Sequence, residues 1–148
     1  MNFRYDNRHE YDLKLACQRY DFLLPEYFMH VTNDELYEIW NGIGATGDWW
    51  NDYIPKTVYG VDVTLASLPH DISFFFEKTK REYHIANLHL LFNMNQIVRY
   101  QSNNEFMRTL RYLRTNKYYI GTETDDGWDS FVEGSEECAR YKKCLPVA

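Results

Sequence analysis

The segment from Arg81 to Tyr100 constrains the fold most strongly, because its apolar side chains recur at the spacing of an α-helix. Its sequence is REYHIANLHLLFNMNQIVRY. The apolar positions that share this spacing are Ile85, Leu88, Leu91 and Phe92. Residues three or four positions apart lie on one side of a helix, so the segment predicts a long amphipathic helix.

The residues before this segment predict shorter elements. The first 30 residues lack a sustained helical period and indicate one short helix with irregular packing. Thr32 is a favourable cap, and the acidic residues that follow it predict a helix from about Asp34 to Trp40. Three glycines within residues 41–47 then stop the helix and allow the backbone to form a tight loop.

A second short helix is expected directly before the long one. Residues 48–60 predict an irregular connection, because they combine a tryptophan pair with proline and glycine. Asp62 or Thr64 can then cap a helix over about 62–78. Proline disrupts a helix interior, so Pro69 should bend this helix or delay its start.

The C-terminal third predicts one more helix and a tail. The helix should extend from Glu105 to Tyr118, where apolar residues are spaced by four and three positions: Phe106, Leu110 and Leu113. Basic residues in this region repeat every three positions and should form a solvated face, with contact to anionic lipid head groups as the alternative: Arg108, Arg111, Arg114 and Lys117. The tail after Gly121 contains several Asp and Gly residues and is expected to be rich in loops.

The composition indicates one globular domain over residues 1–148. Its hydrophobic content of 45% is enough for one core. The net charge of -6 argues against binding to nucleic acid, which requires clustered positive charge. No apolar stretch is long enough to span a bilayer, and no signal peptide is visible. The three cysteines, Cys17, Cys138 and Cys144, do not form an even disulfide framework and favour a reducing compartment.

Three motifs with chemical potential follow one another in the middle of the chain. They are NGIGATG at 41–47, ASLPHD at 66–71 and ANLHLLFNMNQI at 86–97. A glycine loop, a His-Asp pair on one helix and a second long helix in this order resemble the calcium-dependent phospholipase A2 superfamily, especially its bacterial and phage members. The resemblance covers about 34–119 and includes the linker IPKTVYG at 54–60. It is consistent with a cytoplasmic protein or one delivered by a phage particle.

The resemblance implies a mainly α fold in which two long antiparallel helices carry the site, preceded by a glycine-rich calcium loop and flanked by extra terminal helices. His70 would be the general base that activates water, and Asn87 would orient its ring. Asp71 would bind Ca²⁺ together with three backbone carbonyl groups, and the amide of one of these residues would stabilise the oxyanion. The three carbonyl groups would be those of Gly42, Gly44 and Thr46, and the oxyanion amide would be that of Gly44.

Departures from the family pattern lead to geometric predictions. Ile43 and Ser67 stand where the family has a disulfide, so these two residues should be neighbours. Asn87 stands where the family has an orienting Asp, and Phe74 stands where it has a Tyr. We expect His70 and Asn87 on facing helices, with a hydrogen bond of about 2.6 to 3.2 Å between their side chains.

Three functions remain open on the sequence. The resemblance implies hydrolysis of a phospholipid ester at a membrane surface. An inactive relic with a binding or structural role is the second possibility, because Asn87 cannot neutralise a protonated histidine. The third is a helical His-Asp metal phosphohydrolase, whose further ligands would come from His30, His84 and His89. This third function leaves the glycine loop unexplained.

Overall fold

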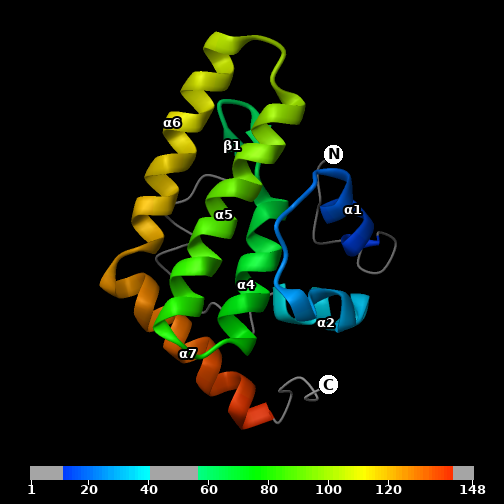
Figure 1. Cartoon of the computed structure of the whole chain (residues 1–148), viewed down its shortest axis with the longest axis vertical. Coiled ribbons are helices and arrows are strands. Elements are labelled where there is room, and N and C mark those ends of the chain that lie inside the picture. Colours follow the sequence, from blue (N-terminus) through cyan, green and yellow to red (C-terminus); the bar gives the residue numbers. More distant parts are fainter. Residues whose placement is uncertain (1–11, 41–56, 142–148) are drawn as a thin grey trace.

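The computed structural model of the chain describes residues 12–40 and 57–141, and these are mainly helical (Figure 1). This confirms the predicted mainly α fold class. None of the helices in these two stretches combines the length and the apolar character required to cross a membrane. The glycine loop at 41–47 lies outside the described residues, as do Trp49, Trp50 and Cys144.

Four helices in the second stretch surround the predicted site. α4 (Ser67–Phe76) and α5 (Lys80–Gln101) form an antiparallel pair, and α6 (Glu105–Thr122) returns along α5. α7 (Asp125–Tyr141) then runs diagonally across one end of the bundle and packs against α4 (Figure 1). The junction between α6 and α7 is therefore brought to the end of the bundle where α4 and α5 meet.

The long helix α5 is present as predicted, but its predicted apolar face is wrong. A capping box fixes its start, since the Glu82 amide donates to Thr79 Oγ1 at 3.1 Å and the Thr79 amide donates to Glu82 Oε1 at 3.0 Å. Ile85, Leu88 and Phe92 are 38%, 51% and 40% exposed. The face that α5 buries contains Tyr83, Ala86, Asn87, Leu90, Asn93, Met94, Gln96, Ile97 and Val98.

The start of α4 agrees with the late start that Pro69 predicted. A short 3-10 helix, η3 (Thr64–Ala66), leads into α4, and the Asp62 carboxylate accepts from the Thr64 amide at 2.8 Å. Pro69 falls in the first turn of α4, where a missing amide hydrogen breaks no helical hydrogen bond. α4 can therefore run unbroken through His70.

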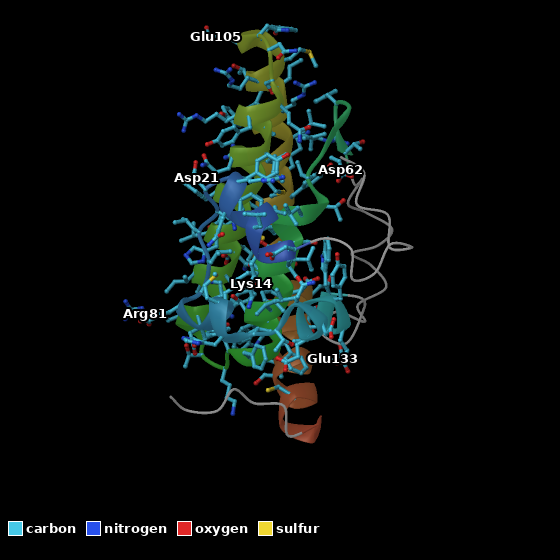
Figure 2. All side chains as sticks on the ribbon, turned by 90° about the vertical axis from the view of Figure 1, so that its right-hand side faces the viewer. Lys14, Asp21, Asp62, Arg81, Glu105 and Glu133 are labelled. Carbon is cyan, nitrogen blue, oxygen red and sulfur yellow. The ribbon has the colours of Figure 1, made fainter. Side chains whose placement is uncertain are left out.

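The N-terminal elements cover one side of α4 and α5 (Figure 2). They are α1 (Leu13–Arg19), η1 (Glu26–His30) and α2 (Asn33–Glu38). Thr32 caps α2 as predicted, because its hydroxyl accepts from the Glu35 amide at 3.2 Å. Asn93 of α5 holds this layer by bonding both backbone groups of Leu23, at 2.7 and 2.9 Å. One hydrophobic core includes residues of both layers, such as Phe28 and Ile97.

The region predicted as an irregular connection contains a small antiparallel hairpin at its end. β1 (Thr57–Val58) pairs with β2 (Val61–Asp62). The two turn residues, Tyr59 and Gly60, have φ values of 45° and 83°. Positive φ at both central positions is the geometry of a tight hairpin turn, which suits glycine but makes Tyr59 an unusual choice.

The basic residues of α6 do not form one solvated face, so this prediction is wrong in part. Arg111 donates to the Tyr59 carbonyl and to Ser102 Oγ, both at 2.9 Å. Arg108 donates to the Ser102 carbonyl at 3.3 Å. These two guanidinium groups therefore fasten α6 to the hairpin and to the end of α5, whereas Lys117 is exposed.

The prediction of a loop-rich tail is also wrong, because α7 occupies most of it. Asp125 and Asp126 lie in its first turn, where carboxylates favour a helix. Gly127 is needed for close packing, since an added Cβ would lie 2.1 Å from the Thr122 carbonyl oxygen. Gly127 resembles a turn signal in the sequence, but the close approach of α7 to the end of α6 is what requires a glycine there.

Candidate functional site

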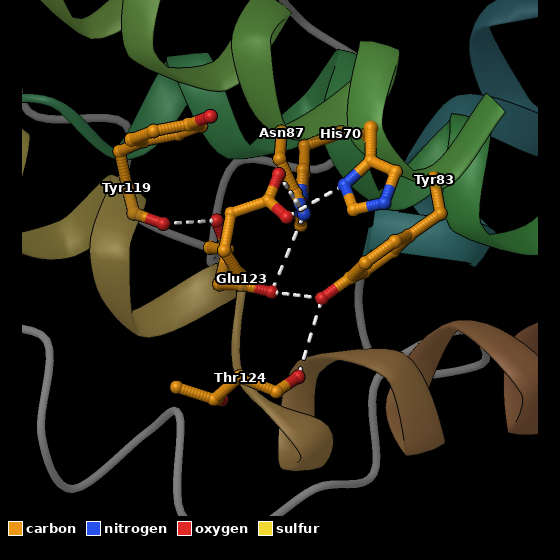
Figure 3. A network of polar contacts seen from close by, with 8 residues as sticks. His70, Tyr83, Asn87, Tyr119, Glu123 and Thr124 are labelled. Atoms are coloured by element: carbon orange, nitrogen blue, oxygen red, sulfur yellow. Dashed lines mark hydrogen bonds and ion pairs between the residues drawn. The ribbon is translucent and has the colours of Figure 1, made fainter. Parts of the chain in front are cut away.

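His70 and Asn87 meet in the interior of the helical bundle. His70 lies on α4 and is 6% exposed, and Asn87 lies on α5 and is fully buried. His70 Nε2 is 2.8 Å from Asn87 Oδ1 (Figure 3). The predicted hydrogen bond between facing helices is therefore present.

The other contacts of Asn87 determine how its amide is oriented. Asn87 Nδ2 donates to the Thr122 carbonyl at 3.3 Å and to Glu123 Oε1 at 3.2 Å. Both partners can only accept, so the amide nitrogen must face them and the amide oxygen must face His70. An amide oxygen only accepts, which requires His70 Nε2 to carry a proton. In the neutral ring, Nδ1 is then the basic nitrogen.

Glu123 joins this network from the end of α6, and no sequence motif includes it. It is the C-cap of α6, and its Oε2 is 2.6 Å from His84 Nδ1. The Glu123 side chain is 21% exposed and the His84 side chain is 48% exposed. One carboxylate thus links a buried amide to a histidine at the surface. The only local signal is that an acid at the carboxyl end of a helix opposes the helix dipole.

Asp71 lies beside His70 and is partly buried. Its Oδ1 is 3.7 Å from His70 Nδ1, and its side chain is 18% exposed. Burial raises the pKa of the Asp71 carboxyl, and a protonated His70 ring opposes part of that shift. A shielded carboxylate gains from a nearby cation, because the cation compensates for the lost hydration.

Aromatic side chains enclose the other side of the His70 ring. The centroids of the His70 and Phe74 rings are 4.0 Å apart, and Phe74 packs edge-on against Phe131 of α7 at 5.2 Å. The hydroxyl group of Tyr83 donates to the Thr122 carbonyl, the same oxygen that accepts from Asn87. Burial and, to a lesser extent, the charge of Glu123 raise the pKa of Tyr83 to about 12. Sequence reasoning overlooked Tyr83, although it lies one helical turn before Asn87.

The expected calcium site stays a prediction, because the described residues do not test it. Asp71 is the kind of ligand that Ca²⁺ prefers, a carboxylate oxygen, and its desolvation fits a cation partner. The expected carbonyl ligands, Gly42, Gly44 and Thr46, lie outside the described residues, and so does the Gly44 amide expected at the oxyanion. Ile43, the expected neighbour of Ser67, also lies outside them. Ser67 Oγ accepts from Trp40 Nε1 at 2.9 Å, and Trp40 directly precedes the glycine loop in sequence.

The structure lends no support to a transition-metal site within residues 12–40 and 57–141. No three side chains of His, Cys, Asp or Glu come together there as metal ligands. His84 bonds Glu123, and His30 is exposed on η1. Burial lowers the pKa of His89, which favours its neutral form.

Comparisons with protein-family models, curated proteins and solved structures find no match for this chain.

Proposed function

We propose that this protein is a calcium-dependent hydrolase of phospholipid esters, similar in chemistry to phospholipase A2. The observation that carries the proposal is the buried hydrogen bond between His70 Nε2 and Asn87 Oδ1. It fixes the ring so that Nδ1, the nitrogen nearer to Asp71, carries the lone pair. A fixed base next to a desolvated carboxylate suits the activation of water at an ester.

In the proposed reaction, His70 Nδ1 takes a proton from a water molecule that attacks the ester carbonyl. Asn87 keeps the ring in position, because its amide is held by two further acceptors. Phe74 covers the ring and restricts access of bulk water. Asp71 and the carbonyl groups of the glycine loop would hold Ca²⁺, which when bound would polarise the ester carbonyl. We assign the Gly44 amide to the oxyanion on the resemblance alone.

The inactive relic is the second candidate, and the neutral side chain of Asn87 favours it. A carboxylate at this position would stabilise a protonated histidine directly, and in a Ser-His-Asp triad the equivalent amide substitution costs about four decades in rate. A relic would bind a membrane or a partner through the same fold and would hydrolyse nothing.

Hydrolysis of phospholipid vesicles with and without calcium separates these candidates. We expect calcium-dependent release of fatty acid by the native chain and none by His70→Ala. His30→Ala, which changes an exposed histidine, is the matched control and should retain full activity. A native chain that is inert on zwitterionic and anionic vesicles alike would favour the relic.

Calcium binding is tested separately by calorimetry. With one carboxylate in the proposed site, the Kd should be weak, roughly 10⁻⁴ to 10⁻³ M. Asp71→Ala should abolish this binding, whereas Asp129→Ala, at an exposed position of α7, should leave it unchanged. Binding that is indifferent to Asp71 would contradict the site assignment.

A further inference from the structure

The His70, Asn87 and Glu123 side chains form a continuous hydrogen-bonded chain across three elements (Figure 3). The His70 ring donates to the amide oxygen, and the amide nitrogen donates to the carboxylate. Each donor and acceptor in this chain has a single consistent direction. The negative charge of Glu123 is thus separated from the His70 ring by the Asn87 amide, whereas an Asp at position 87 would place a charge directly against the ring.

A contact with His84 holds Glu123 in this position. Its Oε2 is bonded to His84 Nδ1, which leaves Oε1 directed at Asn87. Glu123 also caps α6 at the negative end of the helix dipole, where an acid is unfavourable by itself. A purely local role in α6 therefore does not account for a glutamate here, whereas its contacts with His84 and with the buried amide do.

We infer that Glu123 is a positioning residue that supplies a negative charge to His70 through the amide of Asn87. A carboxylate that accepts from an amide N–H polarises the amide and makes its oxygen a stronger acceptor. A stronger acceptor at Nε2–H stabilises the ring when Nδ1 takes up a proton. No proton moves along the chain in this arrangement: the proton gained from water stays on Nδ1 until it is passed to the leaving group. This inference rests on the proposed hydrolytic function.

The kinetic test is the substitution Glu123→Gln. A glutamine can still accept from Asn87 Nδ2 but has no charge, so the geometry is kept while the polarising group is lost. We expect kcat to fall roughly tenfold with KM nearly unchanged, which is comparable to the loss of a hydrogen-bond partner behind a metal-binding histidine. Glu105→Gln removes a charge from the exposed first turn of α6 and should leave both constants unchanged. Equal kcat values in the two variants would overturn the inference and leave the proposed function intact.

A spectroscopic test decides the inference even if the native chain hydrolyses nothing. The proton on His70 Nε2 should give a downfield, slowly exchanging ¹H resonance, because its partner is a buried polarised amide. Glu123→Gln should move this resonance upfield while the ring keeps its Nε2–H tautomer, and Glu105→Gln should not move it. A resonance that stays at the same position in Glu123→Gln would show that the carboxylate does not polarise Asn87. A native chain without activity but with the expected shift would refute hydrolysis and retain the polarisation of Asn87 by Glu123.

Discussion

Placing a carboxylate at position 87 should reveal the negative charge of Glu123 as a loss of stability. In Asn87→Asp, one oxygen of the new carboxylate replaces Nδ2, which is 3.2 Å from Glu123 Oε1. The amide donor that faced the Glu123 carboxylate is replaced by a second carboxylate, so two negative charges face each other. Residue 87 is fully buried, so water screens them poorly. We therefore expect Asn87→Asp to destabilise the fold, although it restores the residue that the resemblance implies.

The penalty can be bounded from this distance. At an effective dielectric constant of about 20, two unit charges so placed repel by about 5 kcal/mol. One carboxyl can instead hold a proton, which at pH 7 costs about 4 kcal/mol for a group whose ordinary pKa is about 4.3. Protonation is the less costly state, so Asn87→Asp should lose about 3 to 4 kcal/mol of unfolding free energy at pH 7.

Urea denaturation of four proteins measures this effect: the native chain, Asn87→Asp, Glu123→Gln and the double variant. In the double variant the glutamine amide can donate to the new carboxylate, so most of the penalty should disappear. The coupling energy of the two substitutions should then be about 3 kcal/mol. Asn116→Asp, at an exposed position of α6, is the control and should show additive effects with Glu123→Gln.

The pH dependence has a definite sign. The folded pair has one raised carboxyl pKa, so the folded state of Asn87→Asp binds more protons than the unfolded state above about pH 4. Its stability should be retained at low pH and lost as the pH rises. A coupling energy below about 0.5 kcal/mol would refute the reasoning, because it would mean that Glu123 does not face residue 87.

Two further predictions concern the scaffold. Burial raises the pKa of Glu77 to about 7, and the Tyr27 hydroxyl donates to its Oε1 at 2.9 Å. At intermediate pH the folded state therefore binds a proton at Glu77 that the unfolded state lacks. The free energy of unfolding should fall by about 1 to 2 kcal/mol between pH 4.5 and 7, after allowance for partial exposure. Glu77→Gln should remove this pH dependence in thermal melts, and an unchanged pH dependence would assign it to another group. Gly127→Ala should cost about 1 to 3 kcal/mol in urea denaturation, because the added Cβ meets a backbone oxygen at 2.1 Å. Gly121→Ala, which has nothing within 4 Å, should change stability by less than about 1 kcal/mol, and equal losses in the two variants would contradict the close approach.

The helices were predictable where a local signal determines them. Thr32 and Pro69 each determine a start through nearby backbone groups, and both starts agree with the structure. The buried face of α5 was not predictable from its apolar spacing. Its polar residues Asn93 and Gln96 are buried because they bond Leu23 and Tyr20, about seventy positions away. A sequence pattern cannot show that such a polar group will be satisfied.

Residues of the site that are close together in the sequence were predictable, and the distant one was not. His70 and Asn87 are 17 positions apart on consecutive helices, and the motifs that resemble phospholipase A2 bring them together. Glu123 is 36 positions beyond Asn87 and belongs to no motif. It reaches the site only because α6 returns along α5 and ends there. The prediction of a loop-rich tail was wrong because it also depended on a contact that the sequence does not show. Gly127 resembles a turn signal until its contact with Thr122 is known.

The presence of Asn87 therefore does not by itself mark a lost activity. An Asp at this position would accept from His70 and would have no hydrogen to donate to Glu123, so the two carboxylates would compete for a proton. An asparagine accepts on one side and donates on the other, which lets a single negative charge act along the chain. In the proposed mechanism, Asn87 and Glu123 together would thus provide the orientation and the charge that one Asp would provide alone. An amide substitution is costly in a catalytic triad partly because it favours the wrong tautomer of the histidine. Here the two acceptors behind Asn87 Nδ2 require the Nε2–H tautomer, so that part of the cost does not arise.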